Sequence, residues 1–273
     1  MERRFAGLEA SEFVQVLYRV FFMREPDPAA QDKVERLVHE VSSVEDIIAE
    51  LLASEEFGSR NDNHQLIRGQ TQHGELELLI RRWMTCAVRD RWVVDVGARG
   101  KARSNSWDLL KTFGWRGLLV EANSALIPII ETEFAGLQME LLNCAISDYE
   151  GEATFYLGVN DDVSSLDRNA SEGWGPLTGE IRVPVHRLAP LLQERGIPEQ
   201  FGLLSIDIEG EDIKVLNDLI ATSAYRPRWV LIEASYDFKT TALRDLPFDL
   251  SVLSAYRLVD QTTSNLLLES NLR

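Results

Sequence analysis

Residues 92–105 read WVVDVGARGKARSN, and residues 114–123 read GWRGLLVEAN. In the first stretch an apolar run ends at Asp95 and meets a glycine turn at Gly97, and in the second an apolar run ends at Glu121. The residues between the two runs have helical character, so the pattern is strand, turn, helix and strand. This pattern predicts the beginning of a parallel sheet whose first turn faces a ligand.

Strand-like and helix-like segments continue to alternate after this beginning. We expect strands at 92–96, 117–121, 138–146, 203–208 and 229–233, and helices at 105–113, 124–134, 211–221 and 246–253. Such alternation requires parallel strands joined by crossover helices. The β-rich segments 257–260 and 265–269 are separated by a short connection and predict an antiparallel hairpin at one sheet edge. The predicted fold class is therefore α/β, with a doubly wound, mostly parallel sheet.

The glycine turn suits a nucleotide-like ligand. Glycines let backbone N–H groups approach an anionic group at an electropositive helix start, and a carboxylate such as Glu121 binds ribose hydroxyls. A dinucleotide fingerprint needs three spaced glycines, whereas Lys101, Ala102 and Arg103 stand at the later positions. The pattern therefore favours an adenosyl cofactor without a pyrophosphate, whose carboxylate Arg99 would bind. A tight turn before an ordinary helix remains the alternative.

Carboxylates gather at the ends of two later strands. Asp207 and Glu209 lie at the end of FGLLSIDIEGED, and Glu233 ends RPRWVLIE. If these strands are neighbours, the three side chains meet, and repulsion between them raises the pKa of one, as a general base requires. Their oxygen atoms would also suit a divalent cation, but we expect no metal. Glu211 and Asp212 instead favour the N-terminus of the following helix.

The segment 152–185 interrupts the alternation of strands and helices. Its β-rich pieces lie at 153–159, 163–166 and 181–185. Because the segment is inserted between the third and fourth core strands, we expect it near the carboxyl edge of the sheet, as a cover for the substrate. Ser164 and Ser165 either donate hydrogen bonds to the substrate or form a turn. His186 is either a base or, more commonly for a single histidine, structural.

The composition excludes several classes of partner and site. The chain of 273 residues has a formal net charge of −16, which opposes nonspecific binding to nucleic acid or to an anionic membrane. Cys86 and Cys144 lie far apart without a CxxC pattern, so we expect core positions for both rather than a disulfide or a thiolate metal site. No leader sequence opens the chain and no apolar run approaches about 18 residues, so we expect a cytoplasmic protein without a membrane span.

The N-terminal part has a helical period. One helix is expected over 13–21 with Ser11 as its N-cap, and the prolines of REPDP at 24–28 must end it. Further helices are expected over 29–40, from Ser42 or Ser43 onward, and over 75–89. The polar stretch between the last two indicates a linker. We therefore expect a helical domain at 1–60, a linker at 61–74 and the main domain at 75–273.

Together these motifs resemble the FkbM family of S-adenosylmethionine-dependent methyltransferases over about 75–268. The motifs that carry the resemblance are DVGA (95–98), SNS (104–106), GWRGLLVEAN (114–123), NCAISDYEG (143–151), SSL (164–166), LLSIDIEGED (203–212) and RPRWVLIE (226–233). The resemblance implies a class I methyltransferase fold, Rossmann-like, with S-adenosylmethionine as cofactor.

The resemblance also implies roles for individual residues. Asp95 and Gly97 would lie at the methionine end of the cofactor, Glu121 at the ribose, and Ala145 and Ile146 near the adenine. Further cofactor contacts would come from Ala98, Arg99, Ser104, Ala122, Asn123 and Asp207. The family usually has an Asn, Asp and Gly run after DVGA, whereas this chain has Arg99, Gly100 and Lys101, with one residue fewer before SNS.

The segment 13–57 resembles a small helical domain of unknown function related to phycobilisome linker domains. The resemblance implies a role in positioning, in binding a protein partner or in self-association, and it supplies no catalytic chemistry.

We therefore predict an O-methyltransferase that acts on a hydroxyl of a sugar, a glycan or a natural product, with Asp207, Glu209 and Glu233 as the catalytic residues. The altered glycine loop leaves open a methyltransferase-like binding module without activity. A nicotinamide-dependent oxidoreductase is a further alternative, although the chain contains no YxxxK motif.

Overall fold

The chain divides into two compact units, Met1–Val88 and Arg89–Arg273. The computed structural model describes residues 4–5, 8–22, 24–57, 70–83, 90–160, 163–234 and 243–271. Most of the predicted linker at 61–74 lies outside the described residues, and so do Cys86 and the end of the helix predicted over 75–89. The domain boundaries proposed from the sequence stay predictions.

The first unit is built mainly of helices. Its described elements are β1 (Arg4–Phe5), β2 (Leu8–Glu9), α1 (Ala10–Phe22), η1 (Pro28–Ala30), α2 (Gln31–Val38), α3 (Val44–Leu52) and α5 (Glu75–Trp83). Ser43 caps α3 in a capping box with Asp46, as the sequence predicts. The prediction of Ser11 as an N-cap was wrong, because α1 already begins at Ala10. The Glu12 carboxylate accepts the Glu9 N–H there at 3.0 Å.

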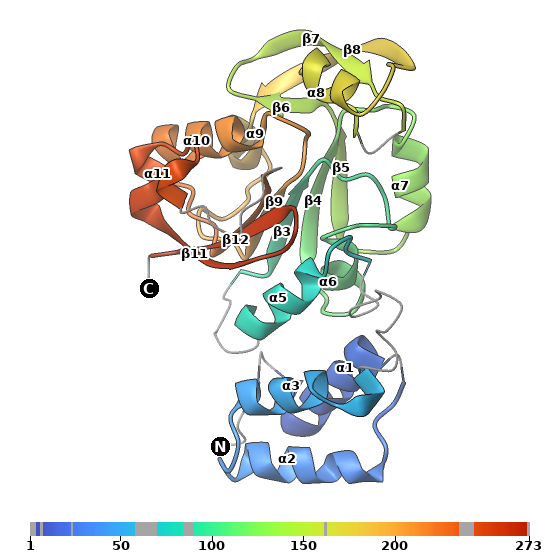
Figure 1. Ribbon diagram of the computed structural model, residues 1–273, viewed down its shortest axis with the longest axis vertical. Helices are drawn as coiled ribbons and strands as arrows, with labels where there is room; N and C mark the ends of the chain where they lie inside the picture. Colours follow the sequence, from blue (N-terminus) through green and yellow to red (C-terminus); the bar gives the residue numbers. More distant parts are fainter. Residues whose placement is uncertain are drawn as a thin grey trace. The chain divides into compact units, whose positions relative to one another are not determined.

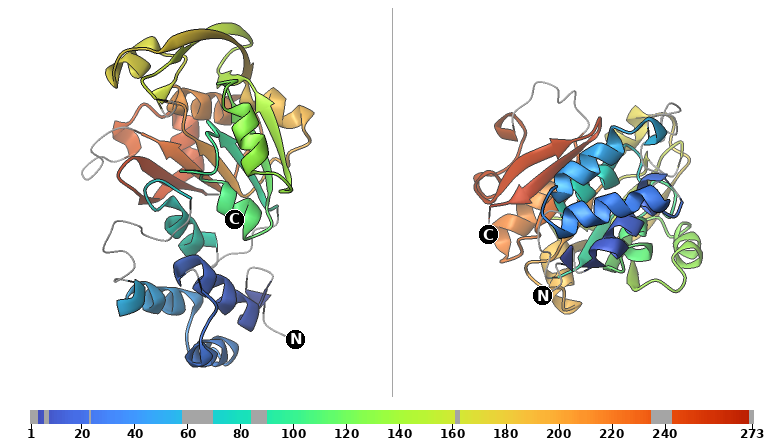
Figure 2. Two further views of the ribbon diagram at one scale, coloured as in Figure 1. Left: turned by 90° about the vertical axis from the view of Figure 1, so that its right-hand side faces the viewer. Right: turned by 90° about the horizontal axis from the view of Figure 1, so that it is seen from below.

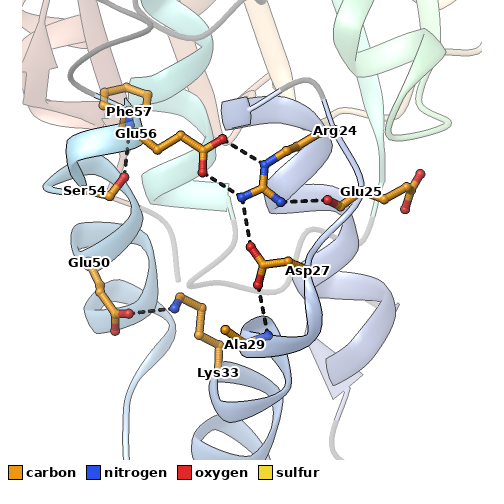
Figure 3. A network of polar contacts seen from close by, with 9 residues as sticks. All are labelled: Arg24, Glu25, Asp27, Ala29, Lys33, Glu50, Ser54, Glu56 and Phe57. Carbon is orange, nitrogen blue, oxygen red and sulfur yellow. Dashed lines mark hydrogen bonds and ion pairs between the residues drawn. The ribbon is translucent and has the colours of Figure 1, made fainter.

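Arg24 connects the end of α1 to the segment after α3 (Figure 3). Its guanidinium donates to both carboxylate oxygens of Glu56, at 2.8 and 2.7 Å, and to Asp27 at 3.1 Å. Asp27 also accepts the Ala29 N–H, which caps the 3-10 helix that begins at Pro28. The proline-rich stretch therefore ends α1 as predicted and is held by ion pairs.

In the second unit, seven strands of the described residues form one sheet (Figure 1). Their order is β11 (Tyr256–Gln261), β12 (Asn265–Ser270), β10 (Trp229–Glu233), β9 (Leu203–Ile206), β3 (Trp92–Val96), β4 (Arg116–Glu121) and β5 (Met139–Asn143). The five strands from β10 to β5 are parallel, and β12 is antiparallel to both of its neighbours. The predicted doubly wound sheet with an antiparallel edge hairpin is confirmed.

Helices pack on both faces of this large sheet. On one face, α9 (Leu188–Glu194), α10 (Asp212–Thr222) and α11 (Leu250–Ala255) share a core with apolar residues of the strands (Figure 1, orange and red). Elsewhere α6 (Trp107–Lys111) places Leu110 against Gly117 of β4, and α7 (Ile127–Glu133) contacts β5. Among the described residues, no helix is both long and apolar enough to cross a membrane.

The segment predicted as one strand over 138–146 is two strands, so that prediction was wrong. The chain leaves the large sheet after Asn143 and enters β6 (Ala145–Ser147), which joins β8 (Gly179–Arg187) and β7 (Gly151–Leu157) in a small sheet. Because β5 leads directly into β6, the small sheet lies at the carboxyl ends of the parallel strands (Figure 2, left). The 152–185 insert, which also contains α8 (Arg168–Gly173), therefore has the predicted position.

Candidate active site

The candidate site lies where the strand order reverses. From β3 the chain continues outward through β4 to β5, and it then returns to the other side of β3 at β9. Ligands of open α/β sheets bind at the carboxyl ends of the strands beside such a reversal. The predicted site residues at the ends of β3, β4, β9 and β10 are on this edge.

The glycine turn after β3 is packed tightly against the end of β9. Gly97 has a φ of +92°, and a Cβ built on it would lie 1.8 Å from the carbonyl oxygen of Asp207. The N–H groups of Gly97 and Ala98 both donate to the Val120 carbonyl, at 2.9 and 3.0 Å. Glycine is required here for close contact between strand ends. Cofactor contacts of Gly97 and Ala98 stay predictions.

Asp95 is buried in a cluster of hydroxyl groups. Its carboxylate accepts the Ser106 hydroxyl at 2.6 Å, while Asn105 donates to the Ser205 hydroxyl at 3.2 Å. Burial raises the pKa of Asp95, and hydrogen bonds from Ser106 and Ser205 oppose that rise. The Ser104 hydroxyl oxygen accepts the Ser106 and Trp107 N–H groups at 3.1 and 2.9 Å, just before α6 begins. The SNS motif thus fixes the loop after β3 to the sheet.

Glu121 is also buried and holds the loop that follows β4. One of its carboxylate oxygens accepts the Asn123 N–H at 2.6 Å. Asn143, at the end of β5, donates to the carbonyls of Glu121 and Ala122 at 2.8 and 3.1 Å. Asn143 is a site residue that the sequence reasoning did not single out. Its motif, NCAISDYEG, was nevertheless part of the family resemblance.

The predicted adenine loop lies beside the loop after β4. Ala145 and Ala122 are both buried in one apolar cluster with Val185 of the small sheet, and Ile146 is buried in the main core. The structure therefore brings the 121–123 and 145–146 segments together. The cofactor contacts predicted for these residues stay predictions.

The loop between the glycine turn and the SNS motif is rich in cations. The Arg99 guanidinium donates to the Ala102 carbonyl at 3.5 Å. The Lys101 N–H donates to Glu133 of α7 at 2.6 Å, and its ammonium group lies 4.4 Å from the centroid of the Trp107 ring. These contacts give the loop a defined course in spite of its departure from the family pattern.

The three carboxylates of the second cluster meet, as predicted. The strands β9 and β10 are parallel neighbours, with Ile206 opposite Ile232. Carboxylate oxygens of Asp207, Glu209 and Glu233 all lie within 4.8 Å of one another, and each residue is half-buried. We call these three residues the acidic triad. Its oxygen atoms could coordinate a divalent cation, and the expectation that no metal binds stays a prediction.

Burial and mutual repulsion raise two pKa values in the acidic triad. The pKa of Asp207 is raised well above its ordinary value, first by burial and then by the charge of Glu233. Burial, followed by the charge of Glu209, raises the pKa of Glu233 to about 8. Asp207 and Glu233 are hydrogen-bonded to each other, so the pair retains a proton near neutral pH.

Asp212 holds the turn after β9 through hydrogen bonds. From the sequence we predicted only that Asp212 favours the N-terminus of the following helix. The buried Asp212 carboxylate accepts the N–H groups of Ile208 and Gly210, both at 2.9 Å. Glu211 bonds instead to the Ser147 hydroxyl at 2.6 Å and to Lys214 at 2.9 Å. Asp212 therefore shapes the turn that carries Glu209.

A cavity of about 540 Å³ opens next to the acidic triad. Glu233 and Gly210 contribute to its wall, and α10 provides much of the remainder. The other lining residues are Asp148, Asp212, Ile213, Lys214, Asn217, Asp218, Ala221, Thr222, Ala234, Pro247 and Asp249. Its lining, which is both polar and apolar, and its contact with Glu233 suit a hydroxylated ligand.

Polar residues of the insert, and His186 next to it, bond within the protein. Ser164 accepts the Gly158 N–H at 3.1 Å, and Ser165 donates to the Glu209 carbonyl at 2.7 Å. His186 bonds through Nδ1 to the exposed Glu150 carboxylate at 2.8 Å. These contacts agree with the structural alternatives given for the two serines and for the histidine.

Comparison with known protein families gives a match over the candidate site. A family model described as the methyltransferase FkbM domain matches residues 95–251, more than half of the chain. The matched range contains the glycine turn, Glu121, the insert and the whole acidic triad. None of the curated proteins compared with this chain matches it.

Proposed function

Because the chain belongs to the FkbM family of methyltransferases, we propose that it transfers the methyl group of S-adenosylmethionine to a hydroxyl oxygen of a sugar, a glycan or a natural product. The second unit has the fold that this family implies, a class I methyltransferase fold. The observation that carries the proposal is the acidic triad, which lies beside a cavity and next to the reversal of strand order.

The donor set at the ends of β3 and β4 fits an adenosyl cofactor. Glu121 offers a carboxylate suited to ribose hydroxyls, and Arg99 offers a cation suited to an amino acid carboxylate. The segments 121–123 and 145–146 lie together, as contacts to one adenosine would require. S-adenosylmethionine would supply a methyl group that is already activated by the sulfonium. The protein then has to bind, orient and deprotonate the acceptor.

Deprotonation of the acceptor hydroxyl is the task that we assign to the acidic triad. Glu209 is our first choice of base and Asp207 the second, with Glu233 in support. A carboxylate among other carboxylates is a stronger base than an exposed one, since its neighbours disfavour further negative charge. The cavity beside Glu233 is where we place the acceptor.

Replacing Glu209 by Gln tests this assignment. We expect the rate of methyl transfer to fall about 100-fold or more, because an amide cannot accept the hydroxyl proton. Affinity for S-adenosylmethionine, measured by calorimetric titration, should change little. Transfer is measured with isotopically labelled methyl groups and a glycan extract as acceptor.

Glu211→Gln is the matched control, since Glu211 lies two residues away and bonds to Ser147 and Lys214 outside the triad. It should transfer methyl groups at the rate of the unchanged protein. Normal turnover in Glu209→Gln would remove Glu209 from the role of base.

A binding module without activity is the second candidate function. The Arg99, Gly100 and Lys101 run favours it, because it replaces the usual family sequence after DVGA. A module of this kind would bind S-adenosylhomocysteine in calorimetry and would transfer no label to any acceptor. Titration with NAD in parallel tests the oxidoreductase alternative.

We further propose that the helical first unit binds a protein partner or a second copy of the chain, and that the enzyme works in the cytoplasm. The net charge of −16 supports a partner that is neither nucleic acid nor an anionic membrane. Sedimentation of the full chain at several concentrations tests self-association.

A further inference from the structure

The turn that carries Glu209 has a backbone conformation that few L residues adopt. Glu209 has a φ of +57°, and Gly210 follows with a φ of +116°. In the left-handed region the Cβ of a residue approaches a carbonyl oxygen, so residues other than glycine, asparagine and aspartate disfavour it. Contacts with the surroundings must therefore hold Glu209 in place.

The polar backbone groups of this turn are bonded on two sides. On one side, the Asp212 carboxylate accepts the N–H groups of Ile208 and Gly210, both at 2.9 Å. On the other side, the Ser165 hydroxyl donates to the carbonyl of Glu209 at 2.7 Å. Asp212 belongs to the same segment of chain as the turn, whereas Ser165 comes from the insert.

Ser165 is itself fixed by its surroundings. Its exposed fraction is 0%, and its backbone N–H and carbonyl both bond to Tyr156, at 3.0 and 2.8 Å. Its hydroxyl oxygen accepts the Asp167 N–H at 2.9 Å. Because Ser165 has little freedom to move, its hydroxyl proton points to the Glu209 carbonyl.

Helix α8 of the insert also packs against the turn. A Cβ built on Gly210 would lie 3.4 Å from the Cβ of Ala170 and 4.0 Å from the Cβ of Asp167. The insert thus touches the turn through close packing at Gly210 and through one hydrogen bond at Glu209.

We propose that Ser165 is a positioning residue, whose hydroxyl holds the turn after β9 and thereby places the Glu209 carboxylate beside Asp207 and Glu233. The inference rests on the proposed function, in which Glu209 is the base. The insert then aligns the acidic triad in addition to covering the site.

Ser165→Ala tests the proposal through the charge that Glu209 exerts on Glu233. The pKa of Glu233 is followed by NMR in protein labelled with ¹³C at the glutamate carboxyl carbons, and Glu233→Gln identifies its signal. Because the charge of Glu209 contributes to the raised pKa of Glu233, displacement of Glu209 should lower that pKa by about one unit. In the transfer assay, kcat should fall about tenfold with unchanged cofactor affinity.

Ser171→Ala is the matched control. Ser171 is a buried serine of the same insert whose hydroxyl donates to a backbone carbonyl, that of Tyr156, at 3.3 Å. Removal of this hydroxyl should leave the pKa of Glu233 unchanged. Ser165→Cys is the second variant, because cysteine has nearly the volume of serine but is a weaker hydrogen-bond donor. It should also lower the pKa of Glu233.

An unchanged pKa of Glu233 in both Ser165 variants, or an equal shift in Ser171→Ala, would overturn the proposal. The titration needs neither cofactor nor acceptor, so its outcome is independent of methyl transfer. Failure of the proposed function would appear instead as normal turnover of Glu209→Gln.

Discussion

Among single residues, the acidic triad concentrates negative charge on three half-buried side chains. Asp207 directly follows β9, and Glu233 ends the neighbouring β10. The two carboxyls are hydrogen-bonded to each other, so the protein retains a proton that two separate carboxyls would release. Such a pair costs stability at neutral and alkaline pH. Strained backbone conformations and charged side chains are common at catalytic sites. Glu209 has both, since its φ is positive and its side chain is a carboxylate.

The stability of the protein should therefore depend on pH through Glu233. The folded protein holds the Glu233 proton up to about pH 8, whereas the unfolded chain releases it near its ordinary pKa of 4.5. The free energy of unfolding should fall as pH rises from about 4.5 to about 8, because in that range the folded state binds the Glu233 proton and the unfolded state does not.

Glu233→Gln should weaken this dependence, since an amide does not ionise, whereas Asp207 keeps a pKa that burial raises. We expect the variant to be more stable than the unchanged protein at pH 9, by about 2 kcal/mol, because solvent screens part of the interaction at a half-buried side chain. Urea denaturation between pH 5 and pH 9 measures the difference. Parallel stability curves for the two proteins would contradict the account.

Only part of the candidate site could be predicted from the sequence. Glu233 and Asp207 follow long apolar runs, and strand ends meet at one edge in any parallel sheet, so their proximity was predictable. The contacts of Asp212, Asn143 and Ser165 were not, because each bonds to backbone groups whose positions depend on the assembled fold. Single-sequence patterns do not contain that information.

At the scale of elements, the turn after β3 decides how closely β3 and β9 approach. The Asp207 N–H donates to the Val96 carbonyl at 3.0 Å, so the two strands remain paired up to the turn. Gly97 lies directly against the Asp207 carbonyl. The turn therefore links the predicted cofactor end of the site to the acidic triad.

Gly97→Ala should destabilise the protein by more than about 3 kcal/mol, because its Cβ would overlap the Asp207 carbonyl and move a strand end. Gly136→Ala is the control. Gly136 also has a positive φ, of +79°, but a Cβ there meets no atom within 4 Å. Its cost should be about 1 kcal/mol, from the backbone conformation alone. Equal losses in denaturant titrations of the two variants would show that close packing at Gly97 is unimportant.

The elements differ in how well the sequence predicts them. Residues 92–96 and 229–233 were predicted with the observed bounds, because strands buried on both faces have continuous apolar sequences. The break at Cys144 and the helix α9 were missed. The sequence 138–146 stays β-rich while the chain changes from one sheet to the other, so periodicity gives no sign of the change.

At the scale of the whole molecule, the chain combines a helical unit and a methyltransferase unit, each with its own core. In the helical unit, Arg24 bonds to Glu56 and Asp27, and its guanidinium lies 5.1 Å from the Tyr18 ring centroid. Phe57 contacts the edges of Phe21 and Phe22 nearby. These contacts join α1 to the segment after α3 within the first unit.

Arg24→Ala should therefore weaken the helical unit alone. We expect a loss of about 1–2 kcal/mol, because the variant leaves two carboxylates without their partner and removes the cation–π contacts. Hydrogen exchange followed by mass spectrometry should show faster exchange within 10–57 and unchanged exchange within 90–234. Arg19→Ala is the control, since Arg19 forms an exposed ion pair with Glu25. Faster exchange in both units would show that they are coupled.

We propose above all that S-adenosylmethionine binds at the carboxyl ends of β3 and β4. The decisive experiment is a crystal structure of the full chain with S-adenosylhomocysteine. We predict density for the ligand over the turn at Gly97, with its ribose hydroxyls bonded to the Glu121 carboxylate and its sulfur atom directed to the acidic triad. Density at another surface, with Glu121 still bonded only within the protein, would contradict the account.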